Sequence, residues 1–369
     1  MEQSRVDYRK IYVSEIQGRY VTYNHLNDFI SNLVTDFKVE DIGMSVRNNR
    51  IKSITYGQGS KRILMWSQMH GNESTTTKAV MDLLNYLQLN SADAQEIRNS
   101  CTLKIIPILN PDGASIYTRV NANKKDLNRD AQDLSQPESR ILNRIYNDFQ
   151  PDFCFNLHDQ RTIFNVGTTN KPATVSFLAP AFDLDRNNST TRKMSMQLIA
   201  AMNSVLQEII PGQIGRYDDG FNPNCVGDAF QMKNTPTVLF ESGHYPGDYQ
   251  REKTRELIFY ALLKAILTIS KEIIGKYTID QYLAIPENGK QYVDILIKNV
   301  KPINNGFNKG SSIFMQYKEL LKEGKIHFQP EILHFDVMPN EIFGHKILDY
   351  NEEVDVRWLR ENGILKLLS

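Results

Sequence analysis

The amino-acid sequence predicts an α/β protein with a mixed, largely parallel central sheet flanked by helices, followed by a small β-rich C-terminal domain. Three observations predict this fold class. Four nearly continuous apolar runs of strand length lie between residues 62 and 241. Helical patterns separate these runs, and alternation of buried strands with helices is typical of an α/β sheet. After about residue 276 the helical patterns give way to strand-like segments.

The four apolar runs are expected to be strands that helices cover on both faces, because they show little polar alternation. An earlier segment, residues 41–57, is expected to be a hairpin that turns at Asn48 and Asn49. The four runs are Ile63–Gln68, Leu103–Leu109, Phe153–Leu157 and Thr237–Phe240.

Helices are expected where apolar residues recur at a spacing of three and four. The longest pattern runs from Gln250 to about Lys276, after which the character of the sequence changes. We therefore expect one domain over residues 1–276 and a small β-rich domain over residues 277–369. The other expected helices are Thr75–Leu89, Glu138–Phe149 and Arg192–Ile209, and the expected C-terminal strands are Tyr292–Val300, Ser312–Gln316 and Ile326–Val337.

The composition argues against several classes of protein. Lysine plus arginine equals aspartate plus glutamate, at 43 each. Nucleic-acid binding is therefore disfavoured, because neutralising phosphates requires a basic surface. No apolar stretch is long enough for a membrane helix, and the first residues do not resemble a signal peptide. The three cysteines are widely spaced and odd in number, which does not suggest disulfides. We therefore expect a cytoplasmic protein.

Residues that can bind a metal ion or transfer a proton follow three of the four apolar runs. His70 and Glu73 come after the first run, His158 after the third and Glu241 after the fourth. In open α/β sheets, ligands bind beyond the carboxyl ends of the strands. These strand ends are therefore expected to deliver two histidines and two glutamates to one crevice.

His70, Glu73 and His158 fit the ligand set of a catalytic zinc ion, which needs three protein ligands and an open position. The HxxE pattern alone is common by chance. The alternative is a strand-end histidine that caps the next helix, with Glu73 favoured near the helix N-terminus. His158 could likewise be a satisfied core histidine.

Glu241 directly follows Thr-Val-Leu-Phe, so its carboxylate is expected to be poorly solvated. Loss of solvation raises the proton affinity of a carboxylate, whereas a nearby metal ion opposes that shift. Such a group can move protons for a metal-activated water. The alternative is a buried salt bridge.

A polar segment over residues 119–130 contains Arg119, Asn128 and Arg129. Arginine binds carboxylates through two parallel hydrogen bonds, and donors of this kind can stabilise a developing oxyanion. The segment therefore suits an anionic substrate end. By composition alone, a solvated surface loop would be the favoured interpretation.

These motifs stand in the order found in the zinc carboxypeptidase superfamily, which the sequence resembles over residues 62–245. HxxE is His70-Gly71-Asn72-Glu73, NPDG begins at Asn110, and RxNA begins at Arg119. DLNR is Asp126-Leu127-Asn128-Arg129, a Pro-Glu pair stands at residues 137 and 138, and the last strand ends in Phe240-Glu241. Several linked motifs in order are far more specific than any one of them.

The resemblance implies a role for each matching residue. His70, Glu73 and His158 would bind one zinc ion, and Glu241 would be the general base and then the acid. Arg119 would stabilise the oxyanion, and Asn128 with Arg129 would hold the substrate's terminal carboxylate. The family also has a mobile tyrosine, for which Tyr217 is the nearest candidate.

The resemblance implies a metallocarboxypeptidase that hydrolyses a C-terminal peptide bond. Its substrate would be a peptide or a small acylated amino acid with a free carboxylate, since HGNE is shared with a deacylase branch. Some bacterial relatives act on peptidoglycan peptides. The family often has an aromatic residue soon after DLNR, where Asp130-Ala131-Gln132 stand here, and digestive members usually have small polar and aromatic residues where Asp159-Gln160 follow His158. The substrate therefore stays open between these three classes.

Overall fold

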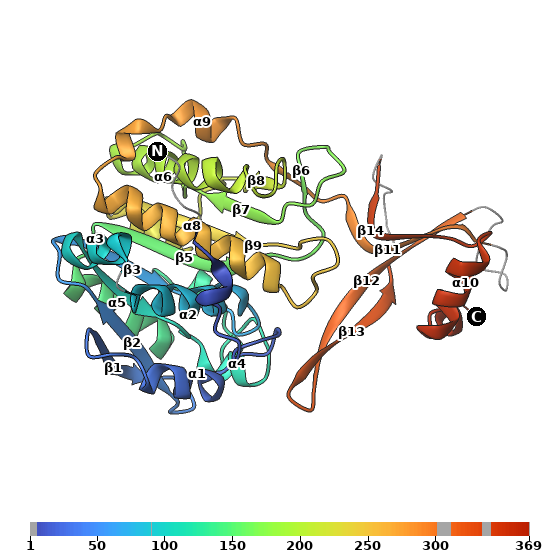
Figure 1. Cartoon of the computed structure of the whole chain (residues 1–369), viewed down its shortest axis with the longest axis horizontal. Coiled ribbons are helices and arrows are strands. Elements are labelled where there is room, and N and C mark those ends of the chain that lie inside the picture. Colours follow the sequence, from blue (N-terminus) through green and yellow to red (C-terminus); the bar gives the residue numbers. More distant parts are fainter. Residues whose placement is uncertain (1–5, 90, 301–310, 334–340, 369) are drawn as a thin grey trace.

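The structure is a computed structural model that describes residues 6–89, 91–300, 311–333 and 341–368. Figure 1 shows a large body in which helices cover a central sheet, and a smaller sheet that extends from one side of it. The larger body contains the first nine strands, and the smaller sheet is formed by β11 to β14. The α/β class and the β-rich C-terminal region are therefore as expected.

In the described part of the chain, eight strands form the main sheet in the order β1-β2-β4-β3-β5-β9-β7-β8. The four central strands β4, β3, β5 and β9 are parallel. The outer pairs β1–β2, β2–β4 and β7–β9 are antiparallel. These strands are β1 (Phe37–Met44), β2 (Arg50–Tyr56), β3 (Lys61–Trp66), β4 (Cys101–Ile106), β5 (Phe153–Asp159), β7 (Val175–Leu178), β8 (Ile214–Arg216) and β9 (Thr237–Ser242).

Side chains that alternate along β3 belong to two different cores. Ile63 and Met65 pack in the cluster that contains α2, α6 and α8, whereas Leu64 and Trp66 pack in the cluster that contains α5 and α7. This explains why the strands have no polar face, because helices cover the sheet on both sides. The helices are α1 (Tyr23–Ser31), α2 (Thr75–Leu87), α3 (Ala92–Ser100), α4 (Pro111–Ser115), α5 (Pro137–Phe149), α6 (Thr190–Leu206), α7 (Val226–Met232), α8 (Glu252–Ser270) and α9 (Ile279–Leu283), with single turns of 3-10 helix at Tyr8–Lys10, Leu127–Arg129 and Ile274–Lys276.

The expected strands and helices are present, with shifts at their ends. The hairpin turns at Asn48, whose φ of 59° lies in the left-handed region that asparagine tolerates. The expected helix over residues 250–276 was too long, because α8 ends at Ser270. Its end is set by Glu272, whose φ of 55° cannot continue a right-handed helix.

The strands β7 and β8 and the helices α3, α4 and α7 were not expected from the sequence. The two strands have four and three residues, too few to show a period. β7 extends the sheet by pairing antiparallel to β9, with Ser176 opposite Glu241. The sheet therefore contains antiparallel strand pairs on both sides of its parallel centre.

The smaller sheet has the order β13-β12-β11-β14. Its core includes Ile295, Ile313 and Leu348, with Leu359 from α10 packed against them. The strands are β11 (Tyr292–Val300), β12 (Ser311–Lys322), β13 (Lys325–Ile332) and β14 (Phe343–Asp349), followed by α10 (Glu353–Glu361) and α11 (Leu365–Leu368). The expected strand over residues 326–337 is matched up to residue 332, and its residues 334–337 lie outside the described part.

The segment that joins the two sheets packs on the larger body. Tyr282 and Ile285 belong to the larger core, and β10 (Asn288–Gly289) pairs with β6 (Asn165–Val166). The boundary at residues 276 and 277 stays a prediction. The three cysteines are free. None of the described helices combines the length and apolar character that crossing a membrane requires.

Candidate active site

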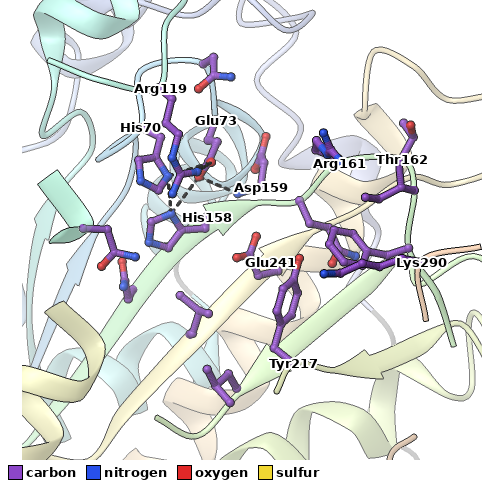
Figure 2. A pocket seen from close by; sticks show the side chains of 18 of the residues that line it. His70, Glu73, Arg119, His158, Asp159, Arg161, Thr162, Tyr217, Glu241 and Lys290 are labelled. Carbon is purple, nitrogen blue, oxygen red and sulfur yellow. Dashed lines mark hydrogen bonds and ion pairs between the residues drawn. The ribbon is translucent and has the colours of Figure 1, made fainter. Parts of the chain in front are cut away.

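The carboxyl ends of β3, β5 and β9 meet at one edge of the sheet because these strands are parallel neighbours. His70 and Glu73 lie in the turn between β3 and α2, where the Glu73 N–H donates to the His70 carbonyl at 3.0 Å. His158 on β5 is directly opposite Glu241 on β9, and opposite residues in a sheet project from the same face. Figure 2 shows these four side chains gathered around one pocket.

The side chains of His70, Glu73 and His158 present three donor atoms within 4.8 Å of one another. The two Nδ1 atoms are 3.1 Å apart, and each lies 2.8 Å from a carboxylate oxygen of Glu73. All three side chains are buried. Two imidazole nitrogens and a carboxylate oxygen aimed at one point form the donor set of a catalytic zinc site. The residues therefore fit one divalent cation.

Asp126 contacts the edge of the His70 ring that faces away from the cluster. Its Oδ1 lies 3.0 Å from Nε2 of His70, which leaves Nδ1 of that ring facing the cluster. Burial alone would raise the pKa of Asp126, but the hydrogen bond from His70 and the nearby Arg119 keep it well below its usual range. Carboxylates behind metal-binding histidines fix the ring orientation in this way. Sequence reasoning missed this role, although Asp126 begins the DLNR motif.

Glu241 is half-buried and lines the same cavity. Burial raises its pKa well above the usual range, and the negative charges of Glu73 and Asp159 add to the shift. Its Oε2 has no hydrogen-bond partner among the described residues. The alternative of a buried salt bridge is not what the structure shows, since Glu241 forms no ion pair with any described residue. A carboxylate in this state is ready to accept a proton.

Tyr217 follows β8 and points toward Glu241 (Figure 2). Its ring packs against Phe164 at a centroid distance of 5.2 Å. Burial raises the pKa of Tyr217, and the negative charge of Glu241 raises it further. The phenol is therefore protonated and able to donate a hydrogen bond inside the cavity.

Arg119 lies beside the histidine–glutamate cluster. Its Nε donates to Oδ2 of Asp126 at 3.0 Å, and its Nη1 lies 3.3 Å from Oε1 of Glu73. Nearly half of the Arg119 side chain is exposed, at 47%. These contacts place a fixed positive charge next to the point where the three donor atoms meet.

Asn128 and Arg129 line the cavity beside α7. Oδ1 of Asn128 accepts a hydrogen bond from the N–H of Val226 at 3.1 Å, which fixes the amide. Arg129 is exposed and donates from Nη1 to the Asn128 carbonyl at 2.8 Å. It forms no salt bridge with any residue that the structure describes, so its guanidinium is available to a carboxylate.

Asp159 is a second residue that sequence reasoning did not assign. Its Oδ2 accepts hydrogen bonds from the N–H and the hydroxyl of Thr75, at 3.0 and 2.6 Å. Its own N–H donates to Oε2 of Glu73 at 3.2 Å. Asp159 thus links β5 to the start of α2 and orients the Glu73 carboxylate.

The smaller sheet supplies part of the cavity wall. Glu319 on β12 accepts hydrogen bonds from Arg19 at 3.0 Å and from the hydroxyl of Tyr117. The cavity has a volume of about 760 Å³. Its wall includes five residues of the smaller sheet, namely Asp294, Gln316, Tyr317, Glu319 and Phe328. Segments that are about 300 positions apart in the sequence therefore meet at the site.

A mixed α/β sheet thus carries two histidines and a glutamate at one edge, next to the half-buried Glu241, and these donor groups suit a catalytic zinc ion. The comparisons with known proteins agree. Residues 23–149 match the sequence model of the zinc carboxypeptidase family. The expected resemblance to zinc carboxypeptidases is confirmed.

Three relatives illustrate the likeness in sequence. A probable carboxypeptidase 2 of Trichophyton verrucosum is 25% identical over 154 residues, which are 40% of this chain and 28% of the relative. Cytosolic carboxypeptidase 3 of Bos taurus is 22% identical over 51% of this chain and 23% of its own length. A gamma-D-glutamyl-L-diamino acid endopeptidase 1 of Lysinibacillus sphaericus is 37% identical over 83 residues, 20% of this chain and 21% of the relative. The chain thus matches under a third of each relative's length.

Solved structures show the same fold. A metallo-carboxypeptidase from Burkholderia cenocepacia superposes with a TM-score of 0.56 at 17% identity, over 68% of this chain and 70% of that one. A putative carboxypeptidase A from Shewanella denitrificans gives a TM-score of 0.56 at 18% identity, over 69% of each chain. At these identities the likeness concerns the fold.

Proposed function

We propose that this chain is a zinc-dependent metallocarboxypeptidase that hydrolyses the last amide bond of a peptide with a free terminal carboxylate. The observation that carries the proposal is the convergence of His70, Glu73 and His158 within 4.8 Å, with Glu241 paired to His158 across the sheet. The family likeness and the fold support it.

His70, Glu73 and His158 would hold one zinc ion. When bound, zinc polarises the scissile carbonyl and lowers the pKa of water. Asp126 keeps the His70 ring in place through its hydrogen bond of 3.0 Å, and Asp159 does the same for the Glu73 carboxylate.

Glu241 would take a proton from the attacking water and deliver it to the leaving amine. Its raised pKa suits the first transfer, because a carboxylate with higher proton affinity is a stronger base. Arg119 would stabilise the charge that develops on the carbonyl oxygen. Tyr217, which points toward Glu241, would donate a hydrogen bond to the substrate.

Asn128 and Arg129 would hold the terminal carboxylate of the substrate. An arginine that forms no salt bridge with a described residue, together with a fixed amide, matches the two oxygens of a carboxylate. This anchoring selects substrates that end at the residue after the scissile bond.

A test of the proposal is hydrolysis of a panel of acylated dipeptides before and after removal of the metal with a chelator. Activity is expected to disappear with the metal and to return when zinc is added. The variant Glu241→Gln is expected to lose at least about 10²-fold in kcat, the lower bound for a general base, while zinc content stays at the wild-type level. Activity that survives chelation, or a fully active Glu241→Gln variant, would reject the proposal.

A second candidate is an amidohydrolase that acts on small acylated amino acids. The wall that β12 and β13 form at the cavity favours it, since about 760 Å³ is the volume of a small-molecule site. Substrates of increasing length on the acyl side distinguish the two. Activity that falls steeply beyond one acyl group supports the second candidate, and activity that is maintained on longer peptides supports the first.

A further inference from the structure

The cavity end next to the smaller sheet is rich in positive charge. Figure 2 shows Arg161 and Lys290 there, on the far side of Glu241 from Arg119. Both side chains are exposed, and both line the main cavity and an adjoining cavity of about 210 Å³. Within the described ranges, neither side chain forms a salt bridge. Two long cationic side chains at a cavity mouth are thus available to a ligand.

Arg251 adds a third charge close to Arg161, because its guanidinium donates to the carbonyl of the preceding residue, Gln160. It lines the cavity although only 1% of it is exposed. Its guanidinium donates to the carbonyls of Ser242 and Gln160, the second contact at 2.7 Å. Its Nε has no hydrogen-bond partner in the described part of the chain, and no described carboxylate forms a salt bridge with it. Burying a guanidinium without a carboxylate is costly, so this charge needs an explanation.

The carboxylates at the same end are already occupied. Asp294 accepts hydrogen bonds from the hydroxyl of Tyr249 at 2.9 Å and from the N–H of Tyr317 at 2.7 Å. Glu319 is paired with Arg19. Neither carboxylate lies within salt-bridge distance of Arg161, Arg251 or Lys290 in the described part of the chain, so neither occupies the donor groups of these three cations. We call these three residues the cationic end.

We propose that the cationic end binds a carboxylate on the acyl side of the substrate, that is, on the residue whose carbonyl is attacked. The inference rests on the proposed function, which assigns the terminal carboxylate to Asn128 and Arg129 and so leaves the other end for the acyl residue. A glutamyl residue supplies the required group in two ways, through its side chain when α-linked or through its main-chain carboxylate when γ-linked.

The physical reason for selectivity is charge pairing in a shielded cavity. Arg161 offers a planar fork for a carboxylate, whereas Lys290 offers a compact charge on a flexible stem. Exposed charges at the mouth are screened by salt, and the buried Arg251 is screened less. The preference for an acidic acyl residue is therefore expected to weaken, but to persist, at high ionic strength.

The test compares kcat/KM for matched substrates that differ by one charge. The α-glutamyl and γ-glutamyl substrates are each paired with the corresponding amide, glutaminyl or isoglutaminyl, and all end in the same residue. We expect kcat/KM about tenfold higher for at least one acid than for its amide, the effect of one charge-assisted contact. A preference for the α-glutamyl acid identifies the side-chain carboxylate as the bound group, and a preference for the γ-glutamyl acid identifies the main-chain carboxylate.

Variants assign the preference to named side chains. Arg161→Gln combined with Lys290→Gln is expected to lower the acid-to-amide ratio of kcat/KM at least about threefold, with the remaining preference due to Arg251, which stays in place. Lys193→Gln is the matched control, because Lys193 is exposed on α6 and does not line the cavity; its ratio is expected to equal that of the wild type. Both tested side chains are exposed, so loss of folding is not expected.

The possible outcomes separate the two proposals. Hydrolysis of none of the four substrates, with zinc bound, counts against the proposed function. Equal hydrolysis of acids and amides overturns the cationic end while leaving the proposed function intact. A double variant that keeps the full wild-type preference also overturns it, because Arg161 and Lys290 would then contribute nothing to the discrimination.

Discussion

At the scale of single residues, the site depends on groups that orient other groups. Asp126 does not face the point where the three donor atoms meet, yet it fixes the ring of His70 by a 3.0 Å hydrogen bond. Asp159 does the same for Glu73. Nδ1 of His70 and the carboxylate of Glu73 are aimed at one point because of these supporting contacts, so zinc affinity is expected to depend on them.

The variant Asp126→Asn is expected to lower zinc affinity about 10- to 100-fold, the usual effect of removing a carboxylate behind a metal-binding histidine. Competition with a chromophoric chelator measures this. Asp130→Asn is the matched control, because Asp130 lies in the same loop but accepts hydrogen bonds from Ser135 and Gln136 instead. Equal zinc affinity in the two variants would contradict the role of Asp126.

At the scale of elements, a buried ion pair ties α2 to α8. Asp82 and Arg255 are both fully buried, and Nη2 and Nε of the arginine each lie 2.6 Å from a carboxylate oxygen. The same arginine donates to the carbonyls of Val13 and Ile16, at 3.0 and 2.6 Å. The N-terminal segment, the helix that follows the HxxE motif and the long helix are thereby held together.

Replacing Asp82 with alanine is expected to lower the free energy of unfolding by about 3–5 kcal/mol, because the buried guanidinium of Arg255 loses its fully buried partner and, among the described carboxylates, keeps only the partly exposed Glu252 at 3.1 Å. Urea unfolding followed by circular dichroism measures the change. Asp93→Ala is the control, since it breaks the partly exposed pair with Lys271 between α3 and α8 and is expected to cost about 0–1 kcal/mol. A similar loss in both variants would show that burial is not what makes the first pair important.

At the scale of the whole molecule, the contact between the smaller sheet and the larger body contains two neutral histidines. His244 and His345 lie with ring centroids 4.3 Å apart, and Nε2 of His345 bonds the Thr162 carbonyl at 2.8 Å. Burial lowers the pKa of His345 to about 4, although the hydrogen bond to Thr162 opposes the shift. Burial also lowers the pKa of His244 well below its usual range.

The depressed pKa of His345 gives stability a defined pH dependence. In the unfolded chain a histidine titrates near 6.5, so between that value and about 4 the unfolded chain binds the extra proton and the folded one does not. The stabilisation is present above pH 6.5 and is lost as the pH falls toward 4. His345→Gln is therefore expected to lose less in Tm between pH 7 and 4.5 than the wild type. His327→Gln, at an exposed position on β13, is expected to behave as the wild type, and equal pH dependence in all three proteins would contradict this account.

How much of the molecule could be predicted from sequence also depends on scale. The strands β3, β4, β5 and β9 were predictable because two helical layers cover them, which leaves an uninterrupted apolar signal. The convergence of His70, Glu73 and His158 followed from the rule that parallel strands end at one edge. β7 was missed because four residues carry no period, and its antiparallel pairing with β9 is set by contacts between distant segments.

The wall of the cavity was beyond sequence reasoning for a similar reason. Glu319 and Tyr317 lie on a strand with no recognisable motif, and they reach the site through the packing of the smaller sheet on the larger body. Arg251 was equally hidden, since a lone arginine before a helix gives no sign of being buried. The residues within motifs could be predicted from the local sequence, whereas the residues that shape the substrate cavity could not.

The measurement that tests the central claim most directly is a calorimetric titration of zinc into chelator-stripped protein, with His158→Ala alongside the wild type. The wild-type chain is expected to bind one zinc ion, and the variant is expected to bind it far more weakly, because one of three donor atoms is gone. A wild-type chain that shows no saturable zinc binding, or a variant that binds zinc as tightly as the wild type, would contradict the claim that His70, Glu73 and His158 share one ion.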